Sequence, residues 1–524
     1  MQGVNSTLEK LCLEISPSGN LFTQLKFALT SISFNEELTS ISLDSRNVND
    51  SSIFIALGGS SKNGNDYIDD ACNNGCKVVI SQNNEAKLPS VSITSSKQAH
   101  AYVLIHTQNL SSKLGGIARA FYHYQDAVKL CAITGTNGKT SVANLYAQMC
   151  SLLSFPSASI GTLGVNKFTN GNVSLFNETI NTTPDIVSTV THLHQLSKHS
   201  VEHAAIEASS HGLTQDRLQS LVVDTAIFTN LSQDHLDYHG DMASYGEAKR
   251  LLLKADGLKN LVLNADDEES DKWQQSVNSD VDVYWYSVDK PEFFVEAKHK
   301  GCWVSEIDFT PKGSTFMLHS SWGHSPAKIA LIGPFNIANV LASITALLAQ
   351  QFEFDEIVKY IHLLSGVAGR MELFVSTKAS ILVDYAHTPD ALKQALKAAR
   401  KHTPGKLVCV FGCGGDRDTS KRPIMGSIAC KYADETVLTQ DNSRSEDPQI
   451  IINEILSGFA SSKNVRIELE REQAIKMAWQ NSCSKDMIVV AGKGHETYME
   501  LGDERITYNE REVVQSIINN GAKL

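Results

Sequence analysis

The stretch GTNGKT, residues 135–140, combines the residue types that hold a nucleotide phosphate. Two glycines let backbone N–H groups approach an anion, Lys139 adds a positive charge, and the Thr140 hydroxyl suits a magnesium ion. The glycines are closer together than in the common loop G-x-x-x-x-G-K-[ST], which would place a glycine where this chain has Ile133. The stretch predicts a nucleotide-binding loop of a shorter type, whose γ-phosphoryl group goes to water, drives a motion or passes to a second substrate.

A carboxylate at the end of an apolar strand is the second chemically suggestive feature. Glu207 ends the run HAAIE, and a buried carboxylate is unfavourable unless it is paired or bound to a metal ion. We interpret it as a magnesium ligand. Ser209, His211, Gln215 and Arg217 follow and offer hydrogen bonds and one fixed positive charge. The alternative is a capped helix whose polar residues are simply solvated.

The segment TNLSQDHLDYHGD carries a dense set of oxygen and imidazole groups: Asp234, His235, Asp237, His239 and Asp241. A zinc site is conceivable, but the spacing matches no zinc pattern. His235 is better interpreted as a residue that assists magnesium beside a nucleotide, and His239 as a structural histidine. Lys249 is expected to begin the next helix, and by itself it indicates a solvated surface lysine.

Charged residues also follow four apolar runs near the C-terminus, in DYAHTPDAL, FGCGGDRDTSKR, DNSRSEDP and AGKGHETY. Arg417, Arg444 and Lys493 would bring positive charge to one crevice, and Asp441 and Glu496 would add carboxylates. A site with both signs suits a zwitterion such as an amino acid, through charge-assisted hydrogen bonds. The alternative for any one of these motifs is a charged surface loop.

The elements that must position these residues form three α/β regions. A chain of 524 residues is too long for one ordinary core. We expect a small α/β domain over residues 1–108, a central α/β domain with the phosphate loop over 109–368, and a C-terminal Rossmann-like α/β domain over 369–524. Buried strands alternating with helices predict parallel sheets whose crevices lie at the carboxyl ends of the strands. Helices are expected at residues 110–124, 141–153 and 389–402. Strands are expected at residues 127–135, 203–209, 224–232, 381–388, 406–415, 435–442 and 487–494.

Composition narrows the classes of function. The net charge of −12 argues against a general nucleic-acid partner, because a phosphate backbone needs a basic footprint. No apolar run approaches the roughly 18 residues that span a bilayer, and the N-terminus lacks the pattern of a secretory signal, so a cytoplasmic protein without a membrane partner is expected. Ten cysteines without a C-x-x-C pair predict buried, reduced thiols.

The motifs LDSR, GTNGKT, NTTPD, EASSHGL, TNLSQDHLDYHGD, AGRMELF, DYAHTPDAL, GCGGDRD and AGKGHE, in this order, resemble the Mur ligases, and within them the MurE type. The resemblance spans nearly the whole chain. It implies three domains that bind, in order, a uridine nucleotide, ATP and an amino acid. The implied reaction is ATP-dependent addition of meso-2,6-diaminopimelate to UDP-MurNAc-L-Ala-D-Glu through an acyl phosphate, in peptidoglycan precursor synthesis. It also implies Mg²⁺ as cofactor, a role in cell wall biogenesis, cell shape and cell division, and closure of the domains to exclude water.

The resemblance also implies roles for individual residues. ATP would be bound by the loop Gly135, Thr136, Asn137, Gly138, Lys139, Thr140 and Ser141. Mg²⁺ would be held by Thr140, Glu207, His235 and a carbamylated Lys249; with Lys139, the last three would be catalytic. The UDP-MurNAc-dipeptide would contact Leu43, Ser45, Ser60, Ser61, Lys62, Asn181, Thr182, Thr183, Ser209, Gln215 and Arg217. Diaminopimelate would contact Arg417, Asp441, Asn442, Ser443, Arg444, Gly492 and Glu496.

The chain departs from the family pattern at a few positions. Enzymes that add diaminopimelate carry a D-N-P-R loop, and Ser443 replaces its proline, which removes a fixed φ. Ser60 and Ala368 replace a commoner histidine and proline. We favour diaminopimelate over L-lysine, because a lysine side chain offers no anion to Arg444. Two further classes of function stay open: a folylpolyglutamate synthetase, which lacks the N-terminal module, and a nucleotide-dependent switch. A monomer is expected.

Overall fold

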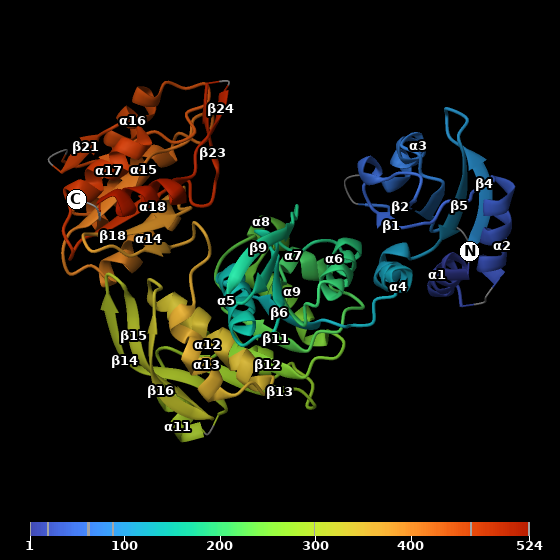
Figure 1. The fold of residues 1–524 in the computed structure, drawn as a ribbon, viewed down its shortest axis with the longest axis horizontal. Helices are drawn as coiled ribbons and strands as arrows, with labels where there is room; N and C mark the ends of the chain where they lie inside the picture. Colours follow the sequence, from blue (N-terminus) through green and yellow to red (C-terminus); the bar gives the residue numbers. More distant parts are fainter. Residues whose placement is uncertain are drawn as a thin grey trace. The chain divides into compact units, whose positions relative to one another are not determined.

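The computed structural model describes residues 2–17, 20–59, 63–85, 88–297, 299–461, 464–502 and 504–521. It is a mixed α/β protein built from several sheets with helices packed against them, as predicted (Figure 1). Contacts group the chain into two units. The first comprises Met1–Lys139, Ser154–Leu261 and Glu269–Asp282, and the second Thr140–Leu153, Val262–Glu268 and Val283–Leu524. Each unit is described by itself.

The N-terminal part of the first unit has a five-stranded sheet in the order β1-β2-β3-β5-β4. All pairs are parallel except β4 with β5. Every residue of β2 is buried, which accounts for its apolar sequence. The strands are β1 (Ser40–Ser42), β2 (Ser52–Ala56), β3 (Val78–Gln82), β4 (Ser90–Ser95) and β5 (Ala101–Thr107). The helices are α1 (Gln2–Ile15), α2 (Asn20–Ser31), η1 (Ser45–Asn47), η2 (Gly64–Tyr67), α3 (Ile68–Asn73) and α4 (Leu110–Tyr122).

The rest of the first unit is organised around four parallel strands in the order β11-β6-β10-β7, followed by the antiparallel strands β8 and β9. In this register Glu207 lies opposite Ile133, and Phe228 opposite Thr134. The carboxyl ends of β6, β10 and β11 therefore meet at one edge. The strands are β6 (Lys129–Thr134), β7 (Ser157–Gly161), β8 (Gly164–Thr169), β9 (Asn172–Asn177), β10 (His203–Glu207) and β11 (Thr225–Phe228). The helices are α6 (Ile186–Lys198), α7 (Ser210–Thr214), α8 (Leu236–His239), α9 (Met242–Arg250), η3 (Leu251–Lys254) and α10 (Ser270–Gln274).

Three elements contribute residues to both units: α5 (Lys139–Leu152), β12 (Asn260–Asn264) and β13 (Asp282–Ser287). In the second unit, β14, β15 and β16 form an antiparallel meander next to β13. Helix α12 is buried along nearly its whole length, which explains its apolar composition. These elements are β13 (Asp282–Ser287), α11 (Glu292–Ala297), β14 (Gly301–Thr310), β15 (Gly313–Ser320), β16 (Gly323–Ile329), α12 (Pro334–Ala349), α13 (Phe354–Tyr360) and η4 (Ile361–Leu363).

A six-stranded sheet in the order β17-β18-β22-β19-β20-β21 follows, parallel except for its edge strand β17. The carboxyl ends of β18, β22, β19 and β20 meet, because Ala491 lies opposite both Asp384 and Phe411, and Phe411 opposite Leu438. Strands are β17 (Glu372–Phe374), β18 (Ser380–Asp384), β19 (Leu407–Phe411), β20 (Glu435–Leu438), β21 (Val465–Ile467) and β22 (Met487–Ala491); a separate hairpin has β23 (Tyr498–Leu501) and β24 (Glu504–Thr507). Helices are α14 (Pro389–Lys401), α15 (Lys421–Tyr432), α16 (Pro448–Leu456), α17 (Arg471–Gln480) and α18 (Glu510–Gly521).

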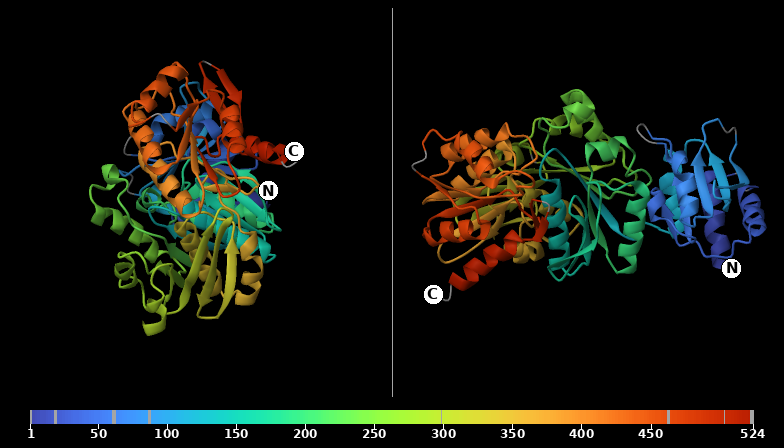
Figure 2. Two further views of the ribbon diagram at one scale, coloured as in Figure 1. Left: turned by 90° about the vertical axis from the view of Figure 1, so that its left-hand side faces the viewer. Right: turned by 90° about the horizontal axis from the view of Figure 1, so that it is seen from above.

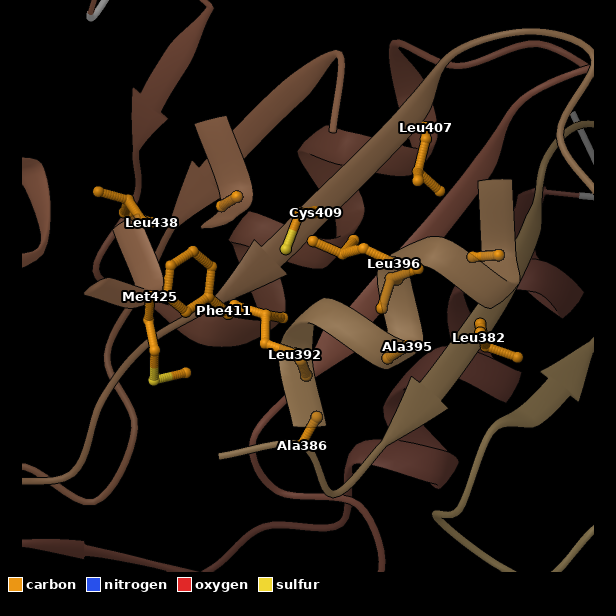
Figure 3. Close-up of a cluster of buried hydrophobic side chains, with 14 of the residues drawn as sticks. Leu382, Ala386, Leu392, Ala395, Leu396, Leu407, Cys409, Phe411, Met425 and Leu438 are labelled. Carbon is orange, nitrogen blue, oxygen red and sulfur yellow. The ribbon is translucent and has the colours of Figure 1, made fainter. Parts of the chain in front are cut away.

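Helices cover both faces of this sheet (Figure 2). Leu382 points to the core under α14, α15 and α16, and its neighbours Ile381 and Val383 point to the core under α17 and α18. Figure 3 shows the first core, where Leu392 and Leu396 of α14 lie against the strands. A sheet buried on both faces leaves the strand ends and their loops as the accessible chemistry.

Within the described residues, no helix is long and apolar enough to cross a membrane. Eight cysteines are buried, as predicted, whereas Cys430 is half-buried and Cys483 is exposed. The expectation of uniformly buried thiols is therefore wrong for these two. Cys430 lies in the last turn of α15 and Cys483 in the turn after α17.

Candidate active site

The glycine loop is held in a conformation that needs glycine. Gly135 and Gly138 have φ of 139° and 89°, in the region that side chains disfavour. A Cβ at Gly135 would also collide with the Thr229 hydroxyl. From the end of β11, the Thr229 hydroxyl donates to the Asn137 carbonyl at 2.6 Å, and the Asn137 N–H donates to Asn230 Oδ1 at 3.0 Å. The loop is thus preformed, with Thr140 and Ser141 partly exposed in the first turn of α5.

Two lysines converge on one backbone carbonyl of this loop. Lys139 Nζ donates to the Gly135 carbonyl oxygen at 2.9 Å, and Lys249 Nζ donates to the same oxygen at 2.8 Å. Lys249 is only 1% exposed. Burial, reinforced by the charge of Lys139, lowers the pKa of Lys249 to about 6, against the pull of Asp234. Burial also lowers the pKa of Lys139, while Glu207 and Asp234 act to raise it. At neutral pH most of the Lys249 amine is therefore uncharged.

The position of Lys249 corrects two expectations from its sequence context. It lies in the last turn of α9 rather than at the start of a helix, and it is buried rather than solvated. Helix α9 begins at the Asp241 cap, whose carboxylate accepts from the Ser244 N–H at 2.7 Å. The helix thus starts at Met242 rather than at Lys249, because the cap lies in the acidic cluster itself.

Glu207 lies at the end of β10, one strand away from the glycine loop, as predicted. The residue is 2% exposed. Oε1 accepts from the Thr162 N–H at 2.9 Å, and Oε2 accepts from the Thr162 hydroxyl at 3.3 Å. Gly161 packs directly against this carboxylate, so that a Cβ there would collide with it. Thr162 was not predicted, because nothing in the run IGTLG distinguishes it from a turn.

The residues around His235 differ in their surroundings. His239 Nε2 and the Ser210 hydroxyl share a hydrogen bond of 2.9 Å, as expected for a structural histidine. His235 is exposed, with its Nε2 3.5 Å from Asp234 Oδ2 and its ring 4.9 Å from that of His211. The side chain of Asp237 lies outside the described residues. In the described chain, no three His, Cys, Asp or Glu side chains stand in an arrangement able to hold a metal ion.

A polar surface lies beside Glu207, on residues predicted to bind the substrate. The Thr183 hydroxyl donates to the Glu207 carbonyl at 2.7 Å and shares a hydrogen bond of 2.9 Å with Ser209. Arg217 donates to the Thr183 carbonyl at 2.6 Å and to Gln215 Oε1 at 2.6 Å. The structure therefore brings four of the predicted residues together. Thr182 adds a hydroxyl that contacts Thr162, and Asn181 is exposed next to it.

A pocket of about 570 Å³ opens on the N-terminal sheet. It includes Leu43 and Ser45, as predicted. The predicted loop of Ser60, Ser61 and Lys62 lies outside the described residues. Sequence reasoning missed the polar and aromatic groups that complete the wall, which are Asp44, Arg46, Tyr67, Asp70, Asn73 and Asn74. They lie in or next to η1, η2 and α3, which only the fold places together.

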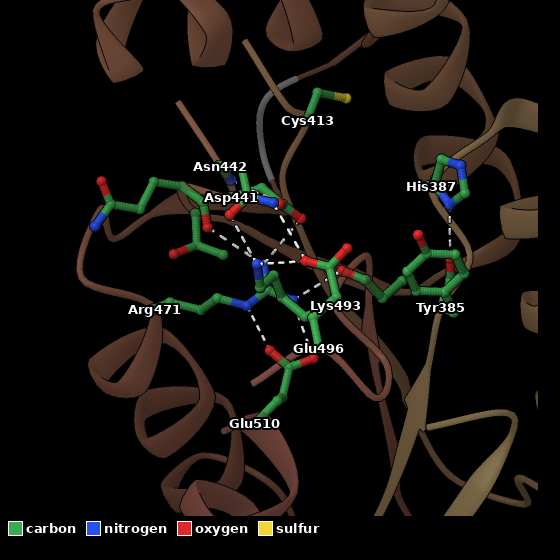
Figure 4. Close-up of polar contacts among 12 residues, drawn as sticks. Tyr385, His387, Cys413, Asp441, Asn442, Arg471, Lys493, Glu496 and Glu510 are labelled. Atoms are coloured by element: carbon green, nitrogen blue, oxygen red, sulfur yellow. Dashed lines mark hydrogen bonds and ion pairs between the residues drawn. The ribbon is translucent and has the colours of Figure 1, made fainter. Parts of the chain in front are cut away.

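At the carboxyl ends of β20 and β22, positively and negatively charged residues are joined by hydrogen bonds (Figure 4). Lys493 is fully buried, and its Nζ donates to Glu496 Oε2 at 2.7 Å and to Asn442 Oδ1 at 2.8 Å. Asn442 Nδ2 donates to the same Glu496 oxygen at 3.2 Å. Gly492 has a φ of 122°, and a Cβ there would lie 2.5 Å from Asp441 Oδ2. Of the residues predicted for this crevice, Lys493, Asn442 and Glu496 are joined in one network, and Asp441 lies beside it.

Two further predicted residues differ in their surroundings. Arg444 donates from Nε to Glu500 Oε2 at 2.8 Å and from Nη1 to the Gly415 carbonyl at 2.8 Å. Arg417 is exposed, and in the described part of the chain it makes no hydrogen bond or ion pair. It is thus not brought into the network in this structure.

Ser443 does not leave its loop loose. It is 4% exposed, and its carbonyl accepts from the Glu446 N–H at 3.1 Å. The preceding carbonyl, of Asn442, accepts from the Gly415 N–H at 2.8 Å. The backbone is held by these bonds where proline would have fixed φ.

An ion pair that the sequence did not reveal lies beneath this network (Figure 4). Arg471 and Glu510 are 1% and 0% exposed, and Arg471 Nε donates to Glu510 Oε2 at 2.5 Å. Arg471 also donates to the Gln440 carbonyl at 3.2 Å and to the Ala491 carbonyl at 2.9 Å. The Gln440 carbonyl lies in the loop after β20, and Ala491 is the last residue of β22. One guanidinium therefore forms hydrogen bonds at both strand ends of the crevice.

Comparison with known proteins identifies relatives for each region. Three family models match the chain: the Mur ligase family catalytic domain over residues 37–122, the Mur ligase middle domain over 133–347, and the Mur ligase glutamate ligase domain over 369–494. The chain is 39% identical over 491 residues to the UDP-N-acetylmuramoyl-L-alanyl-D-glutamate–2,6-diaminopimelate ligase of Haemophilus ducreyi, covering 92% of this chain and 96% of that relative.

Solved structures show similarity to the same family of ligases. A structure of a UDP-N-acetylmuramoyl-L-alanyl-D-glutamate–2,6-diaminopimelate ligase is 33% identical, with a TM-score of 0.69, and the match covers 92% of this chain and 95% of that one. Folylpolyglutamate synthase from Mycobacterium tuberculosis shares only the fold, at 18% identity and a TM-score of 0.52, over 73% of this chain and 92% of its own.

Proposed function

This chain belongs to the Mur ligase family, and we propose that it is the ATP-dependent ligase that adds meso-2,6-diaminopimelate to UDP-MurNAc-L-Ala-D-Glu. Residues 1–108 would bind the uridine nucleotide, residues 109–368 ATP, and residues 369–524 the amino acid. The observation that carries the proposal is the pair of sites at strand ends: a phosphate loop with two lysines, and a crevice with both signs of charge. The product would be a cytoplasmic peptidoglycan precursor, required for cell shape and division, and the enzyme would act as a monomer.

The first chemical step makes the substrate carboxylate reactive. A carboxylate oxygen attacks the γ-phosphorus of ATP, the bond to the β-phosphate oxygen breaks, and an acyl phosphate and ADP result. Lys139, fixed at the mouth of the glycine loop, neutralises the phosphate charge that repels the incoming carboxylate. Thr183, Ser209, Gln215 and Arg217 hold the substrate in line with the phosphate.

The second step forms the amide. The α-amino group of diaminopimelate, after losing its proton, attacks the acyl carbon, and inorganic phosphate leaves. Arg444 would bind the distal carboxylate of the amino acid, and Asp441, Asn442 and Glu496 its other polar groups. Lysine has no distal carboxylate, so the same site would bind it more weakly.

Magnesium would be held near the glycine loop by oxygen ligands. Glu207 and Thr140 would supply them, and His235 lies at the exposed side. Lys249 is a buried amine that is mostly uncharged at neutral pH, and the uncharged form is the one that reacts with CO₂ to give a carbamate with oxygen ligands. Mg²⁺ would supply charge neutralisation for the phosphates and the attacking carboxylate.

Phosphate release with ATP, Mg²⁺ and UDP-MurNAc-L-Ala-D-Glu, measured with meso-diaminopimelate or L-lysine in parallel, tests the proposal. Release coupled to tripeptide formation is expected with diaminopimelate. Turnover with lysine alone would retain the ligase and reject the amino-acid assignment. Release that ignores the amino acid and the UDP-substrate would instead indicate a nucleotide-dependent switch.

Arg444→Ala is expected to raise the KM for diaminopimelate by about 100-fold, because a charge-assisted hydrogen bond to the distal carboxylate is lost. The KM for ATP should not change. Arg466→Ala is the matched control, since Arg466 is exposed on the edge strand β21. An unchanged KM for diaminopimelate in Arg444→Ala would remove this residue from the amino-acid site.

Gly161→Ala is expected to lower kcat by about 100-fold, because its Cβ displaces the Glu207 carboxylate from its place at the strand end. The requirement for Mg²⁺ should shift to higher concentrations, which a magnesium titration of phosphate release measures. Gly246→Ala on α9 is the control, since its Cβ would meet only ordinary contacts at 3.4 Å and beyond. Normal magnesium dependence in Gly161→Ala would contradict the assignment of Glu207.

A further inference from the structure

His402, the residue that follows α14, is a buried histidine whose two ring nitrogens contact backbone groups of two other elements. The residue is 0% exposed. The Gly333 N–H, at the start of α12, donates to His402 Nε2 at 2.8 Å. Because Nε2 accepts this bond, the proton of the neutral ring is on Nδ1. Nδ1–H then donates to the Thr310 carbonyl, at the end of β14, at 2.9 Å.

Apolar packing holds the same three elements together. The Phe309 ring makes a T-shaped contact with the His402 ring, with 4.7 Å between the ring centroids. Ile332, in the segment that leads into α12, is fully buried in the core under α14. The Thr310 hydroxyl donates to the Gly313 carbonyl at 3.1 Å and so closes the turn between β14 and β15. All these residues belong to the second unit. The contact of the α14 end with this turn and with the start of α12 is called the His402 junction below.

The charged groups around the junction do not favour a second proton on His402. Lys401, its neighbour on α14, carries a positive charge that acts against one. Arg400 is engaged in an ion pair of its own. The first turn of α12 has no acidic residue, and the side of β14 and its turn carries the exposed Asp308 and Lys312, which have opposite charges. A charge on the ring would therefore lie in a buried place without a carboxylate to balance it.

Protonation of His402 would remove the acceptor on which the junction depends. A proton on Nε2 would leave the Gly333 N–H facing another N–H and would bury a charge. Burial lowers the pKa of His402 from its ordinary 6.5, against the backbone carbonyls of the turn, and Lys401 adds to the lowering. An open junction thus binds a proton that the closed junction does not. The closed junction therefore loses stability as the pH falls below 6.5 toward the lowered pKa.

We propose that His402 is a pH-sensitive switch in the fold: the neutral ring holds the end of α14 on the β14–β15 turn and the start of α12, and the protonated ring releases them. The sheet under α14 carries the crevice at the ends of β20 and β22. Acid would therefore loosen the attachment of this sheet to the meander before the fold is lost. The inference does not depend on the proposed function, because every group it uses belongs to the junction itself.

Hydrogen–deuterium exchange at about pH 7.5 and about pH 5, corrected for intrinsic rates, tests this switch. In the wild type, residues 331–336 and 398–404 should lose protection by about 10-fold or more at the lower pH, since uptake of one proton shifts the opening equilibrium by up to about tenfold per pH unit. In His402→Gln an amide oxygen can accept from the Gly333 N–H and does not titrate, so protection should change by less than about twofold. His362→Gln, at an exposed position in η4, is the control and should behave like the wild type.

Three results would overturn the proposal. Unchanged protection of both segments in the wild type at the lower pH would show that protonation does not release the junction, and this result needs no variant. An equal loss in β2 and β3 of the N-terminal sheet would show that acid weakens the whole fold. An equal pH response in His402→Gln would assign the effect to another group. His402→Phe keeps the ring contact with Phe309 but accepts no hydrogen bond, so its junction should already be unprotected at about pH 7.5; wild-type protection there would also contradict the switch. Thermal unfolding confirms that each variant is folded.

Discussion

Lys249→Met is expected to abolish ligation and at the same time to stabilise the protein. The buried amine donates to the Gly135 carbonyl at 2.8 Å and lies next to the charge of Lys139. Without it, the carbamate that we propose as a magnesium ligand cannot form. We expect phosphate release to fall by about 10³-fold. The Gly135 carbonyl stays satisfied in the variant, because Lys139 Nζ also donates to it at 2.9 Å.

The stabilisation follows from the lowered pKa of Lys249. This pKa falls from 10.5 to about 6 on folding, so between these values the unfolded chain binds a proton that the folded chain does not. Stability of the wild-type protein therefore rises with pH across this window, and the lysine is most unfavourable below it. Methionine has no such proton. At pH 7 the variant should be more stable by on the order of 2–4 kcal/mol.

Denaturant unfolding of wild type and Lys249→Met as a function of pH measures this effect. Buffers free of CO₂ and Mg²⁺ keep the wild-type lysine uncarbamylated. Lys254→Met, at an exposed position at the end of η3, is the control and should change neither activity nor the pH slope. A variant that is less stable than wild type at pH 7 would show that burial of the amine does not destabilise the folded protein. Near-normal phosphate release would remove Lys249 from the catalytic set.

The sequence predicted those parts of the fold in which local pattern and burial agree. Strands β6, β10, β18 and β22 are short apolar runs that end in polar residues, and all of them were found where expected. The N-terminal helix α1 was missed, although its buried residues Leu8, Leu11, Cys12 and Ile15 follow helical spacing. The meander β14–β16 was missed as well, although its strands alternate polar and apolar residues and Pro311 and Gly313 mark the turn between β14 and β15.

The residues of the candidate site also fall into two groups: those that the local sequence indicates and those that only the fold reveals. Glu207 and the glycine loop could be found because a carboxylate at the end of a buried strand and glycines before a helix are locally unusual. Lys249 was assigned by family resemblance alone, since its burial comes from packing that no local pattern encodes. Thr162 forms a hydrogen bond with Glu207, which lies 45 residues away along the chain, and Glu500 forms one with Arg444, 56 residues away. Pairs of this kind become visible only once the strands are in register.

Arg471→Met is expected to destabilise the protein by about 3–5 kcal/mol, because it leaves the Glu510 carboxylate buried without its counter-charge. In the sequence ELEREQAI, Arg471 is one charge among many and predicts a surface position. In the fold it is 1% exposed, and Glu510 is 0% exposed. The Gln440 and Ala491 carbonyls lose their donor too. Urea unfolding measures the change, and Lys359→Met, in the exposed pair with Glu356, should have little effect.

A double variant separates the ion pair from its support of the crevice. Arg471→Met/Glu510→Met removes both charges, so most of the lost stability should return, as it does when a buried pair is replaced by apolar side chains. The KM for diaminopimelate should remain raised, because the loops after β20 and β22 still lack the guanidinium that joins them. The destabilisation of Arg471→Met alone should shrink as the pH falls toward the ordinary pKa of a glutamate, since the isolated carboxyl then folds in its neutral form. A double variant as unstable as the single one would show that the carbonyl contacts, and not the charge of Glu510, dominate the role of Arg471.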